Sequence, residues 1–205
     1  MPIKIHYPTA RALVKPIFVA SGLVNSKSNG MPVIGVIGKL TSRIDNMTVT
    51  IEGETVLFRI RRHKVVGKHC WVILFKVPAV HAGNYTLEVT SILADGSTAQ
   101  ADKVLHINVG AVRLLEVEHP SSNDVITPEE KDYLVASGPI SPVAVFATRA
   151  TLTNGALVVI ADYIDTSPED HIWWATFPPL TKGTYDLVVE GTGNNVGTAV
   201  NVEVP

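Results

Sequence analysis

Residues 83–89 read Gly-Asn-Tyr-Thr-Leu-Glu-Val, and the same spacing of glycine, tyrosine, leucine and valine returns at residues 183–189, Gly-Thr-Tyr-Asp-Leu-Val-Val. In both segments the apolar residues occupy every second position, which is the period of a β-strand with one buried face. A segment that occurs twice also indicates that the chain contains an internal repeat. The sequence therefore predicts a strand at both places within a repeated fold.

Two further matches occur in the same order in both halves of the chain. Residues 18–22, Phe-Val-Ala-Ser-Gly, correspond to residues 134–138, Leu-Val-Ala-Ser-Gly. The opening residues 3–8 resemble residues 115–120, and both segments end in proline. Separate matches that keep one order indicate two copies of the same folding unit.

The two copies are placed at residues 1–110 and 114–205. The offset between matching segments falls from 116 to 100 residues along the chain, so copy one carries extra residues between them. The polar, turn-forming residues 25–30 predict one insertion, and residues 59–68 predict another. Each copy then has about the size of one small domain.

The remaining apolar residues also alternate. Short segments rich in valine, isoleucine and threonine, at residues 47–51 and 157–160, are bounded by turn-forming residues. Only residues 127–131 carry a helix signal, from a threonine cap followed by proline and two acids. Two tryptophan-containing segments place apolar residues on one strand face: Trp71, Ile73, Phe75 and Val77 in copy one, and Trp173, Ala175 and Phe177 in copy two. The pattern predicts an all-β chain of two β-sandwiches.

The repeated Gly-x-Tyr-x-Leu-x-Val segments resemble the corner that leads into strand F of immunoglobulin domains. In that family a tyrosine hydroxyl binds the backbone at the turn between strands E and F, and a cysteine follows two residues later. The resemblance implies structural tyrosine corners at Tyr85 and Tyr185, with Leu87 and Leu187 in place of the cysteine. It implies two tandem immunoglobulin-like β-sandwich domains, and it implies nothing about function.

The two copies differ strongly in charge. Residues 1–110 contain 13 Lys and Arg against 6 Asp and Glu, a balance of +7, whereas residues 111–205 contain 4 against 13, a balance of −9. Because the total is only −2, we expect no attraction of the whole chain to nucleic acid or to a membrane surface. Unlike charges could bring the two copies of one chain together. Between chains they favour contact between copy one of one chain and copy two of the next, which closes a ring or extends a fibre. We therefore expect a homo-oligomer or a larger protein assembly.

The single cysteine, Cys70, excludes an intramolecular disulfide, so both cores are expected to hold by burial alone. The first 19 residues contain three prolines and scattered charges, and they lack the apolar stretch of a signal peptide. If Met1 is the natural start, we expect a product that is made in the cytoplasm or released by a lysing virus. No stretch approaches the roughly 20 apolar residues of a membrane helix.

Basic side chains gather at Arg59, Arg61, Arg62 and Lys64. One interpretation is a strand with an exposed cationic face that runs into a loop. The other is a contact for a phosphate or an acidic protein surface. Because this stretch lacks exposed aromatic side chains on which bases could stack, we do not expect it to bind nucleic acid.

Trp174 is a further candidate for partner binding. Neighbouring residues of a strand face opposite ways, so Trp174 leaves the core if Trp173 lies in it. A tryptophan outside the core can anchor a protein interface or stack on a sugar. Coverage by a neighbouring domain would explain an outward tryptophan equally well, and we favour burial against a partner.

Neither catalysis nor a resident cofactor is predicted. Ser21-Gly22 and Ser137-Gly138 lack the Gly-x-Ser-x-Gly context of a nucleophile elbow, and both pairs are interpreted as structural turns. The seven histidines show no spacing typical of zinc sites, and His63 with His69 is better explained by a solvated loop.

Acidic residues gather at Asp162, Asp165, Glu169 and Asp170, and oxygen ligands on such a stretch suit calcium. The stretch lacks the glycine turn and the closing glutamate of a dedicated calcium loop. We therefore interpret it as a solvated acidic loop and predict no metal site.

These features favour a non-enzymatic structural or binding protein. The leading hypothesis is a virion component, such as a capsid decoration or tail-associated protein of a bacteriophage, because tandem sandwiches resemble the immunoglobulin-like modules of phage virions. The alternative is a fragment of a bacterial cell-surface adhesin or carbohydrate-binding module, in which Trp174 contacts sugar. A metal-dependent enzyme would need ligands that the sequence does not display. The expected location is the virion, with the cytoplasm and the bacterial surface as alternatives.

Overall fold

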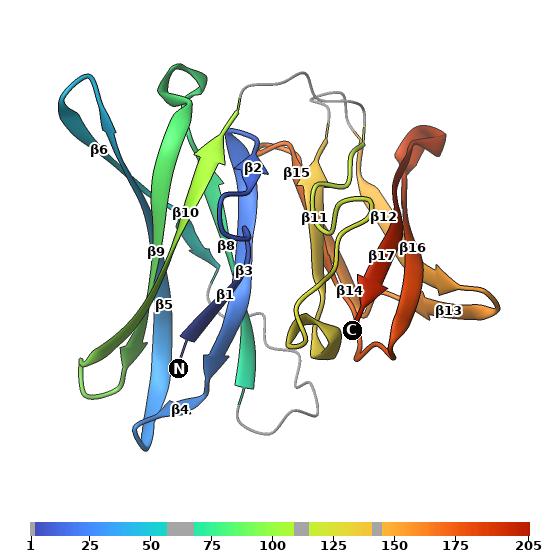
Figure 1. Ribbon diagram of the computed structural model, residues 1–205, viewed down its shortest axis with the longest axis horizontal. Helices are drawn as coiled ribbons and strands as arrows, with labels where there is room; N and C mark the ends of the chain where they lie inside the picture. The colour runs from blue at the N-terminus through green and yellow to red at the C-terminus, as the bar shows by residue number, and fades with distance from the viewer. Residues whose placement is uncertain (1–2, 57–67, 109–114, 141–144) are drawn as a thin grey trace. The chain divides into compact units, whose positions relative to one another are not determined.

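The computed structural model describes residues 3–56, 68–108, 115–140 and 145–205 (Figure 1). The predicted all-β class is confirmed, since the regular elements are strands apart from three single-turn 3-10 helices in the described residues. The chain divides into two compact units, unit 1 at Met1–Gly110 and unit 2 at Ala111–Pro205. No helix in the described part of the chain has the length and apolar character needed to cross a membrane.

Unit 1 is a sandwich of two sheets around one apolar core. The first sheet has the order β1 (Ile3–Tyr7), β3 (Ile17–Asn25), β8 (Lys68–Lys76) and β7 (Glu54–Val56). The second has the order β2 (Leu13–Val14), β10 (Thr98–Ile107), β9 (Gly83–Leu93), β5 (Met31–Ile44) and β4 (Lys27–Ser28), and β6 (Met47–Glu52) also pairs with β5. Strand β2 runs parallel to β10, whereas the other pairs are antiparallel.

Unit 2 repeats this arrangement with fewer strands. One sheet has the order β11 (Val135–Pro139), β15 (Ile172–Thr176) and β14 (Tyr163–Ser167). The other has the order β13 (Leu157–Ile160), β12 (Ala147–Asn154), β16 (Gly183–Gly191) and β17 (Val196–Val204). The segment before β11 pairs with both sheets, antiparallel to β11 at His119 and parallel to β17 at Val125. The beginning of each unit therefore contacts both of its sheets.

The predicted alternation of apolar residues is confirmed in both cores. The side chains of Trp71, Ile73 and Phe75 on β8 are at most 2% exposed. The equivalent residues Trp173, Ala175 and Phe177 of unit 2 are fully buried. Tyr85, Leu87 and Val89 of β9, with Tyr185, Leu187 and Val189 of β16, complete the two cores from the facing sheets. Burial of such side chains supplies the main favourable free energy of folding.

The prediction that Ser21-Gly22 and Ser137-Gly138 form turns is wrong. Both pairs lie inside strands, β3 and β11. Gly22 lies opposite Trp71, and Gly138 lies opposite Trp173. A Cβ atom at Gly22 would collide with the Trp71 indole and with the backbone of β1, so the glycine is required for close approach rather than for a turn.

The indole reaches across this glycine to the first segment of its unit. Trp71 Nε1 donates a hydrogen bond to the carbonyl of Lys4 at 3.2 Å, and Trp173 Nε1 donates to the carbonyl of Glu116 at 2.8 Å. One buried side chain thereby connects β8, β3 and β1 in unit 1, and it connects β15 and β11 to the segment before β11 in unit 2. The polar end of the indole also finds the partner that a buried N–H needs.

The predicted polar turn at residues 25–30 belongs to the hairpin between β4 and β5. Asn29 and Gly30 have φ values of 49° and 81°, the left-handed region that asparagine and glycine tolerate best. The second predicted insertion, residues 59–68, lies almost entirely outside the described residues. The predicted helix at 127–131 is a single 3-10 turn, Glu130–Asp132.

Candidate interaction surfaces

The basic residues predicted to bind a partner, Arg59, Arg61, Arg62 and Lys64, lie outside the described residues. His63 lies there as well. Their part in binding stays a prediction, and it rests on the charge that they contribute to unit 1.

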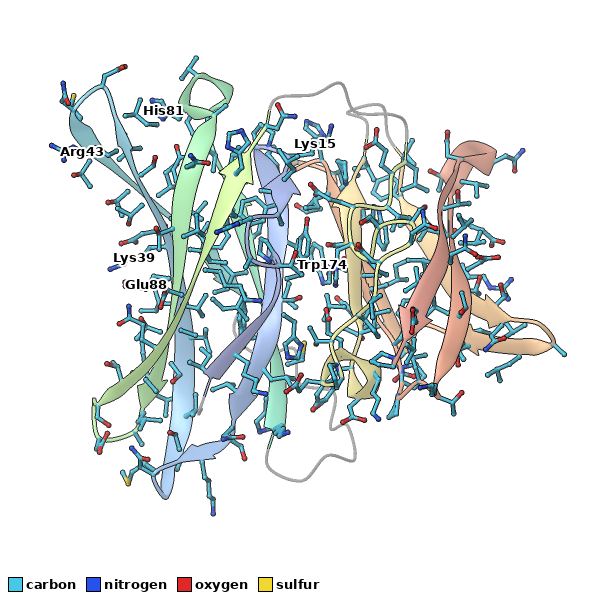
Figure 2. All side chains as sticks on the ribbon, in the orientation of Figure 1. Lys15, Lys39, Arg43, His81, Glu88 and Trp174 are labelled. Carbon is cyan, nitrogen blue, oxygen red and sulfur yellow. The ribbon has the colours of Figure 1, made fainter. Side chains whose placement is uncertain are left out.

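Trp174 and Trp173 face opposite ways on β15, as predicted from the strand period. Trp173 belongs to the core of unit 2, whereas Trp174 is half-buried and lies outside that core (Figure 2). In the sheet, Trp174 pairs with Ser137 of β11 on one side and with Asp165 of β14 on the other. The indole therefore lies on the outer face of the β11-β15-β14 sheet, and its binding role stays a prediction.

The acidic stretch of unit 2 is only partly a loop. Asp165 lies within β14, where its Oδ2 accepts a hydrogen bond from the hydroxyl of Tyr163 at 2.6 Å. Asp170 precedes β15, and its Oδ2 accepts a hydrogen bond from the hydroxyl of Ser167 at 2.5 Å. Both carboxylates are thus engaged by hydroxyls of their own stretch. Within the described residues, no group of three or more His, Cys, Asp or Glu is arranged to hold a metal ion.

The two repeated tyrosines bind the backbone four residues earlier. The hydroxyl of Tyr85 donates to the carbonyl of His81 at 2.7 Å, and that of Tyr185 donates to the carbonyl of Thr181 at 3.0 Å. Leu87 and Leu187, two residues farther on, are fully buried. Burial raises the pKa of the Tyr85 hydroxyl above its ordinary value of 10.0. Each bond fixes the loop that leads into β9 or β16.

A buried pair in unit 2 was not predicted from the sequence. His119 Nε2 lies 2.8 Å from Glu130 Oε1, and the two residues are 3% and 2% exposed. Glu130 Oε2 accepts the backbone N–H of Thr127 at 2.7 Å, while the Thr127 hydroxyl accepts the backbone N–H of Glu130 at 3.3 Å. This reciprocal arrangement has the hydrogen bonds of a capping box, although the 3-10 turn itself begins only at Glu130, and its signal was the Thr-x-x-Glu spacing. In unit 1, Tyr7 takes the place of His119 opposite the corresponding serine.

An ion pair lies on the outer face of the larger sheet of unit 1. Lys39 Nζ on β5 is 2.5 Å from Glu88 Oε1 on β9, and the two side chains are 44% and 26% exposed (Figure 2). Glu52 of β6 stands opposite Lys39 on its other side. Such an exposed pair contributes little stability. It does neutralise one cation within its own sheet, so the positive excess of unit 1 comes from other side chains.

Two edge strands expose apolar side chains. Among the described residues, β6 pairs only with β5, and β13 pairs only with β12. Figure 1 shows that each of these hairpins extends beyond the body of its own unit. The exposed fraction is 71% for Met47 on β6, and on β13 it is 46% for Leu157, 53% for Val158 and 53% for Ile160. An apolar edge of this kind offers unpaired backbone groups to another strand.

Comparisons with known proteins define no family. No family model matches the chain, and no curated protein matches it. Among solved structures, SGBP-B of the Bacteroides ovatus mixed-linkage glucan utilization locus, in complex with a mixed-linkage heptasaccharide, is 14% identical with a TM-score of 0.29, covering 100% of this chain and 48% of that one. Dimeric latent PorU from Porphyromonas gingivalis is 12% identical with a TM-score of 0.38, covering 98% and 19%.

A third similar structure is a Ca²⁺-stabilized adhesin that helps an Antarctic bacterium to bind ice. It is 17% identical with a TM-score of 0.27, covering 96% of this chain and 50% of that one. The chain thus spans half or less of the length of these three proteins. At this level of similarity, the comparisons define no function for the chain.

Proposed function

We propose that this chain is a non-enzymatic structural protein, built from two immunoglobulin-like sandwiches, which works through contacts between protein molecules. The fold supports the immunoglobulin-like assignment in two ways. The beginning of each unit contacts both of its sheets, and a tyrosine hydroxyl binds the backbone before β9 and before β16. The two units therefore share one architecture and the same hydrogen bond from a tyrosine hydroxyl to the backbone.

The division of charge carries the functional proposal. The residues that the units share are interior ones, such as Trp71 with Trp173 and Tyr85 with Tyr185. The units differ in charge, since residues 1–110 have a balance of +7 and residues 111–205 have a balance of −9. Unlike charges steer two surfaces together and suppress contact between like surfaces. Unit 1 of one molecule thereby favours unit 2 of the next, which is a heterologous contact that repeats along an array.

A viral particle is the setting that we propose, with the chain as a capsid decoration or tail-associated protein of a bacteriophage. Many identical copies lie side by side on such a particle, so one heterologous contact is used repeatedly. Genes for capsid and tail proteins beside this gene would support the setting. Secretion genes beside it would instead indicate a bacterial surface.

A carbohydrate-binding role at a bacterial surface is the second candidate. Trp174 favours it, because this indole lies on the outer face of its sheet and can stack on a sugar. Glycan binding that is lost in Trp174→Ala would select this candidate.

Light scattering from low to high salt tests the structural role. Assembly should weaken as the salt concentration rises, because the Debye length falls from about 10 Å at 0.1 M to about 3 Å at 1 M. Replacing Arg59, Arg61 and Arg62 by Glu should hinder assembly at low salt and leave the fold intact by circular dichroism. A matched control replaces the exposed residues Arg11, Lys27 and Lys68 by Glu, which changes the net charge equally at dispersed positions.

The outcomes separate local from overall charge. A stronger loss of assembly in the Arg59, Arg61 and Arg62 variant than in the control would place the contact at those residues. An equal loss of assembly in both variants would show that the total charge drives assembly. Assembly that is independent of salt and equal in all three proteins contradicts the proposal. It would show that apolar surface such as Trp174 makes the contact.

A further inference from the structure

We infer that the chain assembles by pairing β13 of one molecule with β6 of a second molecule, along the edge of β6 to which no described strand is bound, so that the two sheets become continuous. The inference rests on the proposed function, because it names the surface through which copies of the chain meet. Its basis is the backbone geometry of the two edge strands, their side chains and their charge.

Neither edge carries a lysine, a proline, a bulge or an inward-pointing charge. Natural edge strands are protected by lysine, proline, bulges or inward-pointing charges. Strand β13 consists of Leu-Val-Val-Ile, with no charge and no proline, and all four side chains are at least partly exposed. Strand β6 reads Met-Thr-Val-Thr-Ile-Glu and has its single charge at the last residue. Both strands are rich in residues that favour extended backbone.

The turns fix which backbone groups point outward. Asp45 and Asn46, between β5 and β6, both have positive φ, 48° and 63°, which defines a two-residue type I′ turn. Gly155 has a φ of 57° in the two-residue turn between β12 and β13, as expected for type II′. The residues that flank such a turn form a hydrogen-bonded pair, and hydrogen-bonded and non-hydrogen-bonded pairs then alternate along the hairpin.

The flanking pairs are Ile44 with Met47 in one hairpin and Asn154 with Leu157 in the other. It follows from the alternation that the next residue, and every second one after it, turns its N–H and C=O away from the hairpin. These outward-facing residues are Thr48 and Thr50 on β6 and Val158 and Ile160 on β13.

An antiparallel register that pairs Thr48 with Ile160 also pairs Thr50 with Val158. Each of these residues then exchanges backbone hydrogen bonds with its opposite residue in the second molecule. The exposed side chains of Val158 and Ile160 would lie beside two threonines, and cross-strand pairs of this type are favourable.

The same register matches the inner faces of the two sheets. It places Val49 opposite Val159 and Ile51 opposite Leu157. Ile51 packs against the core of unit 1, and Val159 packs against the core of unit 2. The core-facing rows of the two units would thus continue into each other. A register shifted by one residue would break both the hydrogen-bond phase and this match of faces.

Charge selects the unlike pair over the like pairs. Pairing β13 with β13 would bring together two units that each have a balance of −9, and pairing β6 with β6 would bring together two units of +7. Pairing β6 with β13 brings +7 to −9. The occupant of each edge is therefore the other edge of a second copy, and the contact is heterologous.

Disulfide crosslinking of the full chain tests the register. In a Cys70→Ser background, one preparation carries Thr48→Cys and another carries Ile160→Cys, and the two are mixed at low salt under mild oxidation. Opposed residues of a hydrogen-bonded pair have Cα atoms about 5.5 Å apart, within the range of about 4.4–6.8 Å that a disulfide bridges. We expect a crosslinked dimer in the mixture, little in either preparation alone, and a loss of crosslinking at 1 M salt.

The matched control mixes Thr48→Cys with Val200→Cys, whose side chain on β17 is similarly exposed, at 44%. Crosslinking there as strong as with Ile160→Cys overturns the inference, as does a dimer formed by either preparation alone in equal amount. Absence of the crosslink while light scattering still shows salt-sensitive assembly overturns the edge pairing and leaves the proposed function standing. A protein that stays monomeric at every salt concentration would contradict both the edge pairing and the proposed function.

A backbone variant gives an independent measurement. Val158→Pro removes an outward N–H and no hydrogen bond of its own hairpin, so we expect at least a tenfold weaker association with unchanged circular dichroism. Val158→Ala keeps the N–H and should associate within about threefold of wild type. Equal association of the proline and alanine variants would overturn the pairing.

Discussion

Gly22 and Trp71 lie opposite each other on β3 and β8, and the missing side chain at Gly22 lets the indole cross β3 to donate a hydrogen bond to the carbonyl of Lys4 on β1. Gly138 and Trp173 repeat the relationship in unit 2, where the acceptor is the carbonyl of Glu116. The Ser-Gly pair that the two copies share is thus explained by the tryptophan that lies over its glycine.

Replacing Gly22 or Gly138 by Ala should destabilise its own unit by about 3 kcal/mol, the upper part of the usual range for overpacking. Each new methyl group would meet backbone atoms that cannot move aside. Urea unfolding followed by tryptophan fluorescence measures the change. Gly35→Ala is the control, because its Cβ would lie 3.7 Å from Ile92 Cδ1, an ordinary contact. Equal stability of all three variants would contradict the close packing of backbone atoms against Gly22 and Gly138.

Replacing Tyr85 or Tyr185 by Phe should destabilise its unit by about 1 kcal/mol, the usual cost of losing one buried hydrogen bond. The ring would stay buried in each variant, so the change isolates the hydroxyl that binds His81 or Thr181. Thermal unfolding of both variants gives the measurement. Unchanged stability in both would remove the tyrosine-corner assignment.

Alkaline pH should act on unit 1 through Tyr85. Burial raises the pKa of Tyr85 in the folded state, so its stabilising effect is complete below about pH 10 and is lost as the pH rises toward the folded pKa. The sign follows because the unfolded tyrosine gives up its proton first. The stability difference between wild type and Tyr85→Phe should therefore shrink above about pH 10. A difference that grows with pH in this window would show that the hydroxyl ionises more easily in the folded state.

Replacing Glu130 by Ala should destabilise unit 2 by about 3 kcal/mol or more, since it leaves buried His119 and the N–H of Thr127 without their partner in this pair. Glu130→Gln should lose less, because its amide oxygen can still accept the Thr127 N–H. Glu203→Ala, at an exposed position, is the control and should change stability by less than about 0.5 kcal/mol. The free energy of unfolding in denaturant measures the change. Equal values for Glu130→Ala and Glu203→Ala would contradict a stabilising role of the His119–Glu130 pair.

Calcium should shift the melting temperature by little or nothing. A ligand stabilises only a folded state that binds it, and Asp165 and Asp170 already accept hydrogen bonds from Tyr163 and Ser167. Differential scanning fluorimetry with and without calcium checks this. A calcium-dependent rise that disappears in Asp165→Ala would prove the expectation wrong.

The sequence predicted strand faces well because burial on a strand follows a period of two. Trp71, Ile73 and Phe75 were assigned to one face, and all of them are buried. The same rule separated Trp173 from Trp174. What the sequence did not reveal depends on distant residues. Gly22 was interpreted as part of a turn, because nothing near it in the sequence announces the indole of Trp71.

The buried pair and the free edges escaped prediction for the same reason. Glu130 was interpreted only as an acid in the first turn of a short helix, and the fold brings His119 beside it. Residues 47–51 and 157–160 were correctly predicted as strands, but which strands lie at an edge depends on the order of the whole sheet. The arginines at 59, 61 and 62 lie outside the described residues, so their assignment still depends on composition alone.

The hydrogen bond of the tryptophan that crosses its glycine holds the interior of each unit together without using any outward side chain. Its donor is an indole N–H and its acceptor is a main-chain carbonyl, so a change of surface side chains leaves both groups in place. After a gene duplication, one copy could thus gain acids and the other bases without any compensating change inside. Replacing the surface residues of one unit by those of the other should yield folded chains. The unit that each chain binds should then be determined by the charge of the new surface residues.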